Sequence, residues 1–537
     1  MVDTADFIIV GGGTADLLLA SRLANDLPDH SVLVLESGPS HPDNTHLCQY
    51  DRYQAIYRPD LDYGYVSTPQ PLLNDRQILY FRGKGLGGSS NINFMAYLYG
   101  SAEDYNHWAD IVGDESWCWD HSTKRRFKEI ETYHMNMTGE LVEYADPKPD
   151  DHGHNGPVDI SLLVQLENGV PCLFDVAVEY GMSPNPDLNS GNPMGIGVSP
   201  STFFEGYRTT SEKVSTGRTT DNLKIFTDAR ITKILFDRSR AHAVETRDGR
   251  QLVAKKEVIL CAGSLDTPKL LLLSGVGQSE ELTTHGIKPA HHLPGVGKNL
   301  ADHVHVILGA EFTAGICLDD RNKFEADSAA VQATRDVWAI DGSGLVGLHN
   351  SNFLAAWLNL PGLYETEEFK GLDGAWQEFL MREAVPHYEL GIGGPRIPPT
   401  YVIPDGTSYF PLALFGMNMQ SRGEVKLQSG NPDDHPLIDL NYLSHPFDLR
   451  VMTDSIREGM KFLETAPGLG SQFTRYILSP KKQAFIREQL LPVFHANGTA
   501  KMGKPDDLQA CVDTSFRVYG LENLRIADLS VCPLTPK

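Results

Sequence analysis

Residues 6–24, DFIIVGGGTADLLLASRLA, decide the fold of this chain of 537 residues. A short apolar run at 7–10 ends in three glycines, and a segment of helical character follows at 17–23. A second β-rich run at 31–35 is closed by Glu36. A strand, a glycine loop, a helix and a second strand within about thirty residues form the βαβ unit of dinucleotide-binding domains. The stretch therefore predicts a Rossmann-like domain.

The glycines of this loop match a fingerprint for binding a dinucleotide. Gly11 and Gly13 fit the first two glycines of G-x-G-x-x-G, which allow a tight turn and let backbone N–H groups approach a pyrophosphate. The pyrophosphate then lies at the helix N-terminus, beside Thr14 and Ala15. Glu36 ends the second strand, where a carboxylate binds the ribose 2′-hydroxyl. A bare glycine-rich turn is the alternative, but the complete βαβ pattern favours a dinucleotide site.

Composition and charge exclude several classes of protein. The net charge of −24 at pH 7 argues against binding nucleic acid or anionic membranes by bulk electrostatics. No run of about 18 apolar residues occurs, so no membrane span is expected. Seven scattered cysteines without a C-x-x-C pair are typical of a reducing compartment and give no zinc-ligand spacing. The first strand begins too early to leave room for a signal peptide, so we expect a cytoplasmic protein without a metal site.

Seven further segments occur in the same order as the signature segments of a known family. They are RGKGLGGSSNIN at 82–93, DYNHW at 104–108, GSLDTPKLL at 263–271 with SGVG at 274–277, PGVGKNLADH at 294–303, SRG at 421–423, HANGTAKMG at 495–503 and NLRIADLSV at 523–531. Together with the N-terminal βαβ unit, they make the chain resemble the glucose–methanol–choline (GMC) family of FAD-dependent oxidoreductases. The matches extend across nearly the whole chain, so chance is a poor explanation for their order.

The resemblance implies an α/β fold with two domains. We expect a Rossmann-like FAD-binding domain of the GMC type and a second α+β substrate domain built on an antiparallel sheet. The pattern after residue 306 agrees, because several segments alternate like strands and 449–464 has helical spacing. The predicted FAD-binding domain is discontinuous and comprises 1–152, 195–305 and 485–537, and the substrate domain comprises 153–194 and 306–484.

Two local patterns give further expectations. Residues 268–273 resemble the start of a buried helix with Pro268 in its first turn. Residues 136–157 are polar and rich in Asp, Pro, Gly and His. We interpret this stretch, with His152 and His154, as a solvated excursion from the core.

The resemblance also implies which residues hold FAD. The loop 85–90 would pass the flavin and offer backbone amides to its edge, and Asn93 would reach the reactive side of the ring. Ile231 would contact the adenine end through its backbone, and Asp528 would bind near the ribityl chain and pyrophosphate. Some members attach FAD to a His of the loop, but Ile92 stands there, so non-covalent FAD is expected. Motif and resemblance together predict as cofactor-binding residues Gly11, Gly13, Thr14, Ala15, Glu36, Gly85, Gly88, Ser89, Asn93, Ile231 and Asp528.

His495, which begins the segment HANGTAKMG, is the predicted catalytic residue. Oxidation of an alcohol needs a group that takes the hydroxyl proton while hydride leaves carbon for flavin N5, and an imidazole suits that proton transfer. His303, by contrast, is interpreted as a buried structural histidine. The substrate is expected to be a small-molecule alcohol, with oxygen, a quinone or another carrier as acceptor. The resemblance leaves the oligomeric state open, and we expect the setting to be a tailoring step in secondary metabolism.

Two departures from the family pattern bear on activity. Asp16 stands where the fingerprint has its third glycine, and it adds bulk against the sheet and negative charge near the phosphates. Family members also continue into a loop with a second catalytic His or Asn and a final helix, whereas this sequence ends at Lys537 and so looks C-terminally truncated. Two alternatives therefore stay open: a catalytically impaired homologue kept for binding or as a scaffold, and a non-redox lyase on the same fold.

Overall fold

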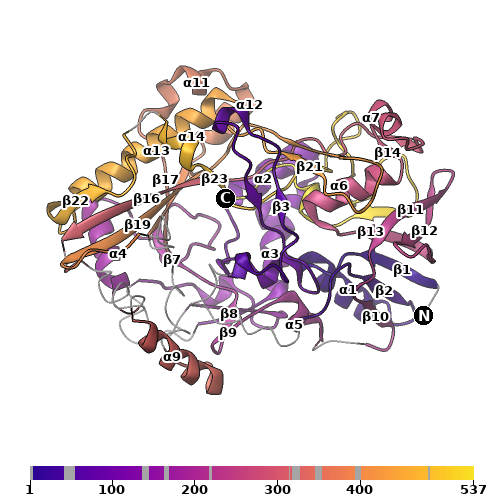
Figure 1. The fold of residues 1–537 in the computed structure, drawn as a ribbon, viewed down its shortest axis with the longest axis horizontal. Helices are drawn as coiled ribbons and strands as arrows, with labels where there is room; N and C mark the ends of the chain where they lie inside the picture. The colour runs from indigo at the N-terminus through magenta and orange to yellow at the C-terminus, as the bar shows by residue number, and fades with distance from the viewer. Residues whose placement is uncertain are drawn as a thin grey trace.

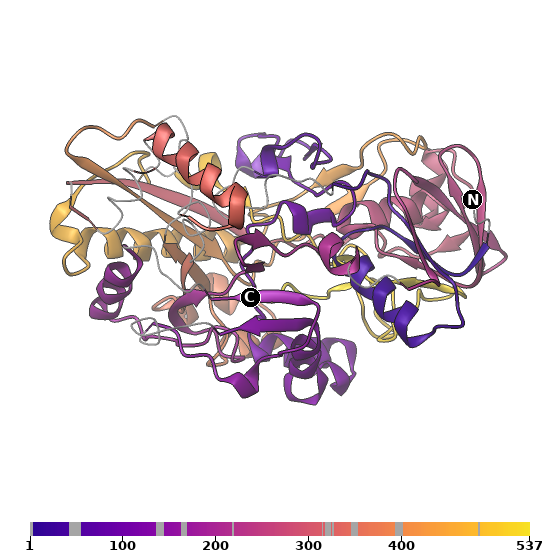
Figure 2. The ribbon, with the colours of Figure 1, turned by 90° about the horizontal axis from the view of Figure 1, so that it is seen from below.

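Two seven-stranded sheets form the two halves of the molecule (Figure 1). The computed structural model describes residues 4–41, 55–135, 144–162, 169–216, 220–313, 315–316, 324, 327–344, 353–392, 401–481 and 484–537. The N-terminus lies at the outer end of the first half and the C-terminus between the halves (Figure 2). The predicted fold class, a Rossmann-like domain with an α+β domain on an antiparallel sheet, is confirmed.

The first sheet carries the glycine loop at the carboxyl end of its first strand. Its order is β10-β2-β1-β13-β12-β11, with β24 beside β13. The pairs from β10 to β13 and from β13 to β24 are parallel, whereas β12 and β11 are antiparallel. Helix α1 (Thr14–Asp26) follows the loop directly, which confirms the βαβ unit. The strands are β1 (Thr4–Val10), β2 (Val32–Leu35), β10 (Leu223–Phe226), β11 (Ile231–Asp237), β12 (Arg240–Thr246), β13 (Gln251–Leu260) and β24 (Leu524–Ile526).

The second sheet places one face against a helix and the other toward the first half. Its order is β22-β16-β19-β18-β17-β7, with β23 beside β16, and these pairs are antiparallel. Side chains alternate between the faces of a strand, so Leu412 and Leu414 face Gly459 of α13 (Pro446–Thr465). Ala413 and Phe415 point the other way, into a cavity. The strands are β7 (Gly195–Ser199), β16 (Val304–Thr313), β17 (Phe353–Leu358), β18 (Tyr388–Ile392), β19 (Thr407–Gly416), β22 (Phe473–Tyr476) and β23 (Leu491–Pro492).

Short elements make up the rest of the described ranges. The short strands are β3 (Tyr65–Val66), β4 (Leu79–Tyr80), β5 (Glu131–His134), β6 (Val158–Ser161), β8 (Phe203–Phe204), β9 (Tyr207–Arg208), β14 (Val276–Gly277), β15 (His291–His292), β20 (Glu424–Lys426) and β21 (Leu437–Asp439). The other helices are α2 (Ala102–Val112), α3 (Lys124–Ile130), α4 (Gly169–Tyr180), α5 (Ser211–Thr216), α6 (Gly263–Leu273), α7 (Ser279–Thr284), α9 (Ser328–Asp341), α11 (Glu367–Lys370), α12 (Gly374–Leu380) and α14 (Phe485–Gln489). No helix in the described part of the chain has the length and apolar character that a membrane crossing requires.

Helix α6 corrects one expectation. Pro268 does not stand in its first turn, because the helix begins five residues earlier, at Gly263. A proline inside a helix cannot donate to the carbonyl four residues before it, which here belongs to Ser264. The hydroxyl of Thr499 donates to that carbonyl instead, at 2.7 Å. The segment that carries His495 therefore supplies the bond that Pro268 cannot make.

The polar stretch that includes His152 also differs from its interpretation. His152 is 1% exposed, and its two ring nitrogens contact the carboxylates of Glu131 and Asp187, each at 3.2 Å. Only His154 is exposed as expected. The solvated interpretation of His152 was wrong because both carboxylates come from outside the local stretch, at distances of 21 and 35 residues along the chain.

Two further observations bear on the predicted organisation. Strand β7 pairs with β17 in the second sheet, although its residues lie in a segment that we assigned to the first domain, so the domain limits stay a prediction.

Cys172 is disulfide-bonded. Disulfides are typical of oxidising compartments, so this bond does not support the predicted cytoplasmic location.

Candidate active site

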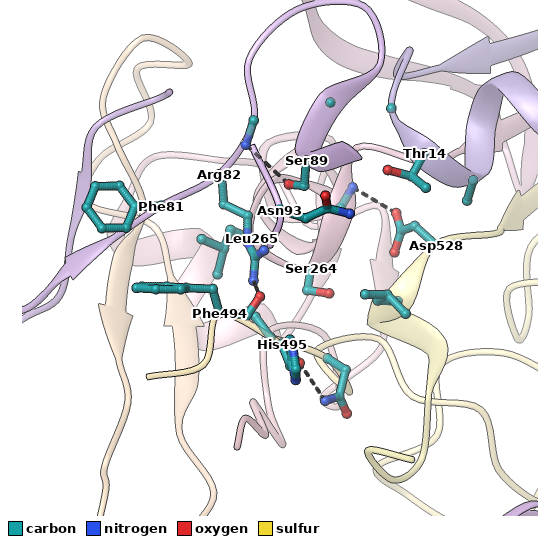
Figure 3. A pocket seen from close by; sticks show the side chains of 18 of the residues that line it. Thr14, Phe81, Arg82, Ser89, Asn93, Ser264, Leu265, Phe494, His495 and Asp528 are labelled. Carbon is teal, nitrogen blue, oxygen red and sulfur yellow. Dashed lines mark hydrogen bonds between the residues drawn. The ribbon is translucent and has the colours of Figure 1, made fainter. Parts of the chain in front are cut away.

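A cavity of about 1670 Å³ lies between the two sheets and reaches from the glycine loop to β16, β18 and β19. Pockets for single small molecules measure roughly 300–1,000 Å³. The volume is therefore sufficient for a dinucleotide and a substrate together. Figure 3 shows side chains of both halves converging on this space, with Thr14, Ser89, Asn93 and Asp528 around its upper part and His495 below.

Two glycine loops meet at one end of the cavity. The N–H of Gly87 donates to the carbonyl of Gly12 at 2.8 Å. A Cβ on Gly88 would come within 2.7 Å of the Cα of Gly13, and φ of Gly88 is +51°, so this contact requires glycine. The second loop thus lies directly over the N-terminus of α1, where an anion binds most favourably.

Glu36 and Asp528 hold the backbone around this end. The carboxylate of Glu36 accepts N–H groups of Gly12 at 2.8 Å and Gly38 at 2.7 Å. The carboxylate of Asp528 accepts the N–H of Gly263 at 2.9 Å and the hydroxyl of Thr267 at 2.6 Å. Both side chains line the cavity. Burial raises the pKa of each carboxyl, against the lowering effect of these hydrogen bonds.

Asp16 is an internal acceptor at the same helix terminus. Its side chain is 2% exposed, and its carboxyl accepts the N–H of Gly13 at 2.7 Å. Asp16 therefore caps the N-terminus of α1 with its own carboxyl. The glycine that usually stands at this position has no side chain and cannot do so. Burial raises its pKa well above the ordinary value, and the negative charges of Asp528 and Glu36 raise it further. The backbone N–H of Gly13, one of the donors that the fingerprint normally offers to pyrophosphate, is therefore already bonded to the Asp16 carboxyl.

Asn93 is fixed by a buried arginine. One guanidinium nitrogen of Arg208 donates to both the backbone carbonyl and the side-chain oxygen of Asn93, each at 2.6 Å. Arg208 is fully buried, and it also donates to the carbonyl of Ser90 at 3.3 Å. The side chain of Asn93 is exposed to the cavity, so its NH₂ group is available there while its oxygen is held.

His495 belongs to a cluster of histidines at the second sheet. Its Nδ1 lies 3.2 Å from Nδ1 of His303, and its backbone N–H donates to Asp302 at 2.8 Å. Asp302 also accepts the hydroxyls of Tyr80 and Tyr442. His303 is buried, as expected, and it also lines the cavity and contacts His495.

Electrostatics keep these imidazoles neutral. Burial is the largest cause that lowers the pKa of His495, and together with the electrostatic effect of Arg82 and His305 it brings the pKa to about 4. The ring is surrounded by protein, yet its accessible surface opens to the cavity that it lines. Burial also lowers the pKa of His303 and that of His305, the latter to about 4. Since Nδ1 of His495 faces His303, Nε2 is the nitrogen left for a ligand.

The structure brings together nearly all the predicted site residues. One cavity is lined by Gly11, Gly13, Thr14, Ala15, Glu36, Gly88, Ser89, Asn93, Ile231, His495 and Asp528. Gly85 is the exception: a Cβ there would meet the carbonyl of Pro39 at 2.4 Å, so its role is to pack the loop. Sequence reasoning missed Arg82, Asp302 and Glu389, of which the first two stand in signature segments and the third has no local signal.

The described residues fit FAD. A helix N-terminus with a close glycine contact, a carboxylate at the end of β2 and a long cavity are the parts that a dinucleotide requires. Asn93 and His495 line the same cavity as these parts. Ile92 has no group that bonds covalently to a flavin, and it is buried.

Comparison with known proteins places this geometry in context. The N-terminal and C-terminal models of the GMC oxidoreductase family match residues 5–305 and 419–537. The chain is 33% identical to an alcohol dehydrogenase [acceptor] of Pseudomonas putida, over 98% of the chain and 91% of that protein. It is 32% identical to an oxygen-dependent choline dehydrogenase of Escherichia coli, over 98% and 91%. A formate oxidase of Aspergillus oryzae superposes with a TM-score of 0.87 at 25% identity, over 100% of this chain and 95% of that one.

Proposed function

The chain belongs to the GMC oxidoreductase family, and on this premise we propose that it oxidises a CH–OH group of a small-molecule alcohol with His495 as proton acceptor. The predicted cofactor, FAD, and the predicted enzyme class are confirmed by this membership. Non-covalent attachment, a tailoring role in secondary metabolism and a cytoplasmic location belong to the proposal.

The position of His495 is the observation that carries the proposal. Bound FAD supplies the acceptor for the hydride that leaves the carbinol carbon. His495 lines the cavity that also contains the glycine loop and Asn93, so the imidazole and the cofactor site share one space. The contact of its Nδ1 with His303 orients the ring, and Nε2 then accepts the hydroxyl proton of the substrate.

The lowered pKa of His495 gives the proposal a pH dependence. Because its pKa is about 4, the imidazole stays neutral, and able to accept a proton, down to about that pH. Activity is therefore expected to fall only as pH drops through about 4, rather than through the ordinary value near 6.5.

The test compares His495→Gln with the unchanged protein in anaerobic flavin reduction by a panel of primary and aromatic alcohols. Loss of the proton acceptor is expected to slow reduction by roughly 10²–10⁴-fold while bound FAD is retained. His154→Gln is the matched control, because His154 is exposed and lies outside the cavity lining. Purified protein without flavin would favour a binding or scaffold protein, and flavin that no alcohol reduces would favour a lyase.

A further inference from the structure

Glu389 is a carboxyl that nothing in the described structure uses. It lies on β18, is 9% exposed and lines the cavity. Among the described residues, no side chain or backbone group forms a hydrogen bond or an ion pair with the carboxyl of Glu389. Burial alone raises its pKa, to about 8, which agrees with the lack of a partner. An unpaired buried carboxylate is costly, so natural proteins rarely keep one without a role.

The sheet fixes where this carboxyl points. Glu389 pairs with Phe415 on β19, and Phe415 pairs with His305 on β16. Residues paired across neighbouring strands share a face, so these three side chains stand in one row on the cavity face. His305 in turn pairs with Leu491, four residues before His495. The row therefore leads from the proposed proton acceptor to Glu389, with two strand spacings of roughly 4.8 Å each between His305 and Glu389.

The surroundings of Glu389 are suited to a cation that pairs with it. Phe415 offers an aromatic face, which attracts cations, and Ile307, Ala413 and Met417 make the neighbouring lining apolar. Four positive side chains line the cavity, and each donates to a backbone carbonyl away from Glu389 and forms no ion pair with it: Arg76, Arg82, Arg230 and Lys269. Within the part of the chain that the structure describes, no positive side chain is left to pair with Glu389, so we consider a ligand as the source of the charge.

We propose that Glu389 selects the substrate, and that the cavity takes alcohols bearing a cationic amine, which pairs with Glu389 while the carbinol faces His495. This inference rests on the proposed function and names its substrate class. The amine supplies the counterion that the described residues do not provide, and Glu389 releases its proton to solvent as the pair forms. Specificity then comes from a buried charge whose only partner is the correct substrate.

The experiment uses matched pairs of substrates on the FAD-loaded protein. Amino alcohols of increasing chain length are compared with the n-alkanols of equal size, for example 6-aminohexan-1-ol with heptan-1-ol. The efficiency of anaerobic flavin reduction is measured for each at neutral pH. The protein is expected to prefer the amino alcohol by at least about tenfold at the best chain length, and Glu389→Gln is expected to bring the ratio close to one.

A control variant and a binding measurement complete the test. Glu311→Gln is the control, because Glu311 lies on the same sheet but pairs with Arg475 outside the cavity lining; it should keep the preference. Hexylamine, which has no carbinol, should perturb the flavin spectrum of the unchanged protein and not that of Glu389→Gln.

The outcomes separate this inference from the proposed function. If alcohols reduce the flavin without a preference for the amine, or if Glu389→Gln keeps the preference, the inference is overturned and the proposed function stands. If no alcohol reduces the flavin but hexylamine binds only when Glu389 is present, recognition of a cation by Glu389 is supported, whereas the proposed function and the selection of an alcohol substrate fail. If hexylamine binds both proteins equally, Glu389 does not recognise a cation.

Discussion

Replacing Asp16 with glycine should tighten the binding of FAD. In the unchanged protein the Asp16 carboxyl accepts the N–H of Gly13, so the pyrophosphate must compete for that donor. Asp16→Gly frees it, and a hydrogen bond to a charged group contributes about 1.5–3 kcal/mol. Since 1.4 kcal/mol is a factor of ten, the dissociation constant should fall about ten- to hundredfold.

The same change should weaken the fold slightly. Loss of the capping acceptor costs α1 about 0.5–2 kcal/mol, so affinity and stability move in opposite directions. The assay is titration of deflavinated protein with FAD, followed by quenching of flavin fluorescence at fixed pH and at about 0.15 M salt, because screening changes charge effects. Thermal unfolding of the deflavinated variant, measured beside it, separates the two effects.

Asp16→Asn divides the effect into its causes. Asparagine keeps an oxygen that accepts the N–H of Gly13 but removes the charge. If the occupied amide limits binding, Asp16→Asn gains little and Asp16→Gly gains most. If the charge limits binding, Asp16→Asn gains most of the effect, and FAD binding to the unchanged protein weakens as rising pH ionises the carboxyl. Equal or weaker affinity in a folded Asp16→Gly protein refutes the reasoning.

Two further predictions concern stability. Hydrogen bonds with Asp187 and Glu131 overcome the effect of burial and raise the pKa of His152 to about 9, so its contribution of roughly 3 kcal/mol is complete below about pH 6.5 and is lost as pH rises through 9. The urea concentration at the unfolding midpoint should fall over that pH range. His152→Gln should lower the midpoint at pH 6.5 and reduce its dependence on pH. An unchanged pH dependence contradicts a charged His152 between Glu131 and Asp187. Thr499→Val should cost about 1–3 kcal/mol, because the Ser264 carbonyl loses its donor. Adding Pro268→Ala restores an N–H four residues on, so the double variant should unfold at a higher temperature than Thr499→Val, and additive losses would contradict the compensation.

Local pattern was sufficient to predict which residues gather at the glycine-loop end of the cavity. The strand, glycines, helix and terminal Glu36 lie within about thirty residues, and the geometry of such a unit follows from its own sequence. The other half depends on pairing between strands distant in the chain. Glu389 on β18 and His305 on β16 face the same side of the sheet because both strands pair with β19. The register of β18 on β19 depends on the burial of a whole face of the strand. No spacing in the sequence carries that information.

Partners that are distant in the chain also explain why the prediction that His152 is solvated was wrong. His152 sits among polar residues that are typical of solvated loops, yet Glu131 on β5 and Asp187 enclose it. Sequence reasoning treats a polar side chain as solvated unless a partner is near in the chain. The parallel pairing of β5 with β6 brings Glu131 to His152, and that pairing could not be inferred from alternation in a stretch of four residues.

Asp16 and Glu389 are buried carboxyls at opposite ends of one cavity, and for both of them loss of water makes ionisation costly. Each is a buried carboxyl whose pKa is raised mainly by loss of water, and each must be neutral or find a positive partner. Asp16 has the partial positive charge of a helix N-terminus and the N–H of Gly13, so it is satisfied by the protein and competes with an anion. Glu389 has no such dipole and no partner within the described residues, so we expect its positive partner to come from the ligand. The pair should therefore respond oppositely to added ligands: the pyrophosphate favours protonation of Asp16, and an amine favours ionisation of Glu389. Proton uptake on FAD binding and proton release on amine binding, measured by calorimetry in buffers of different ionisation enthalpy, would show both signs in one protein.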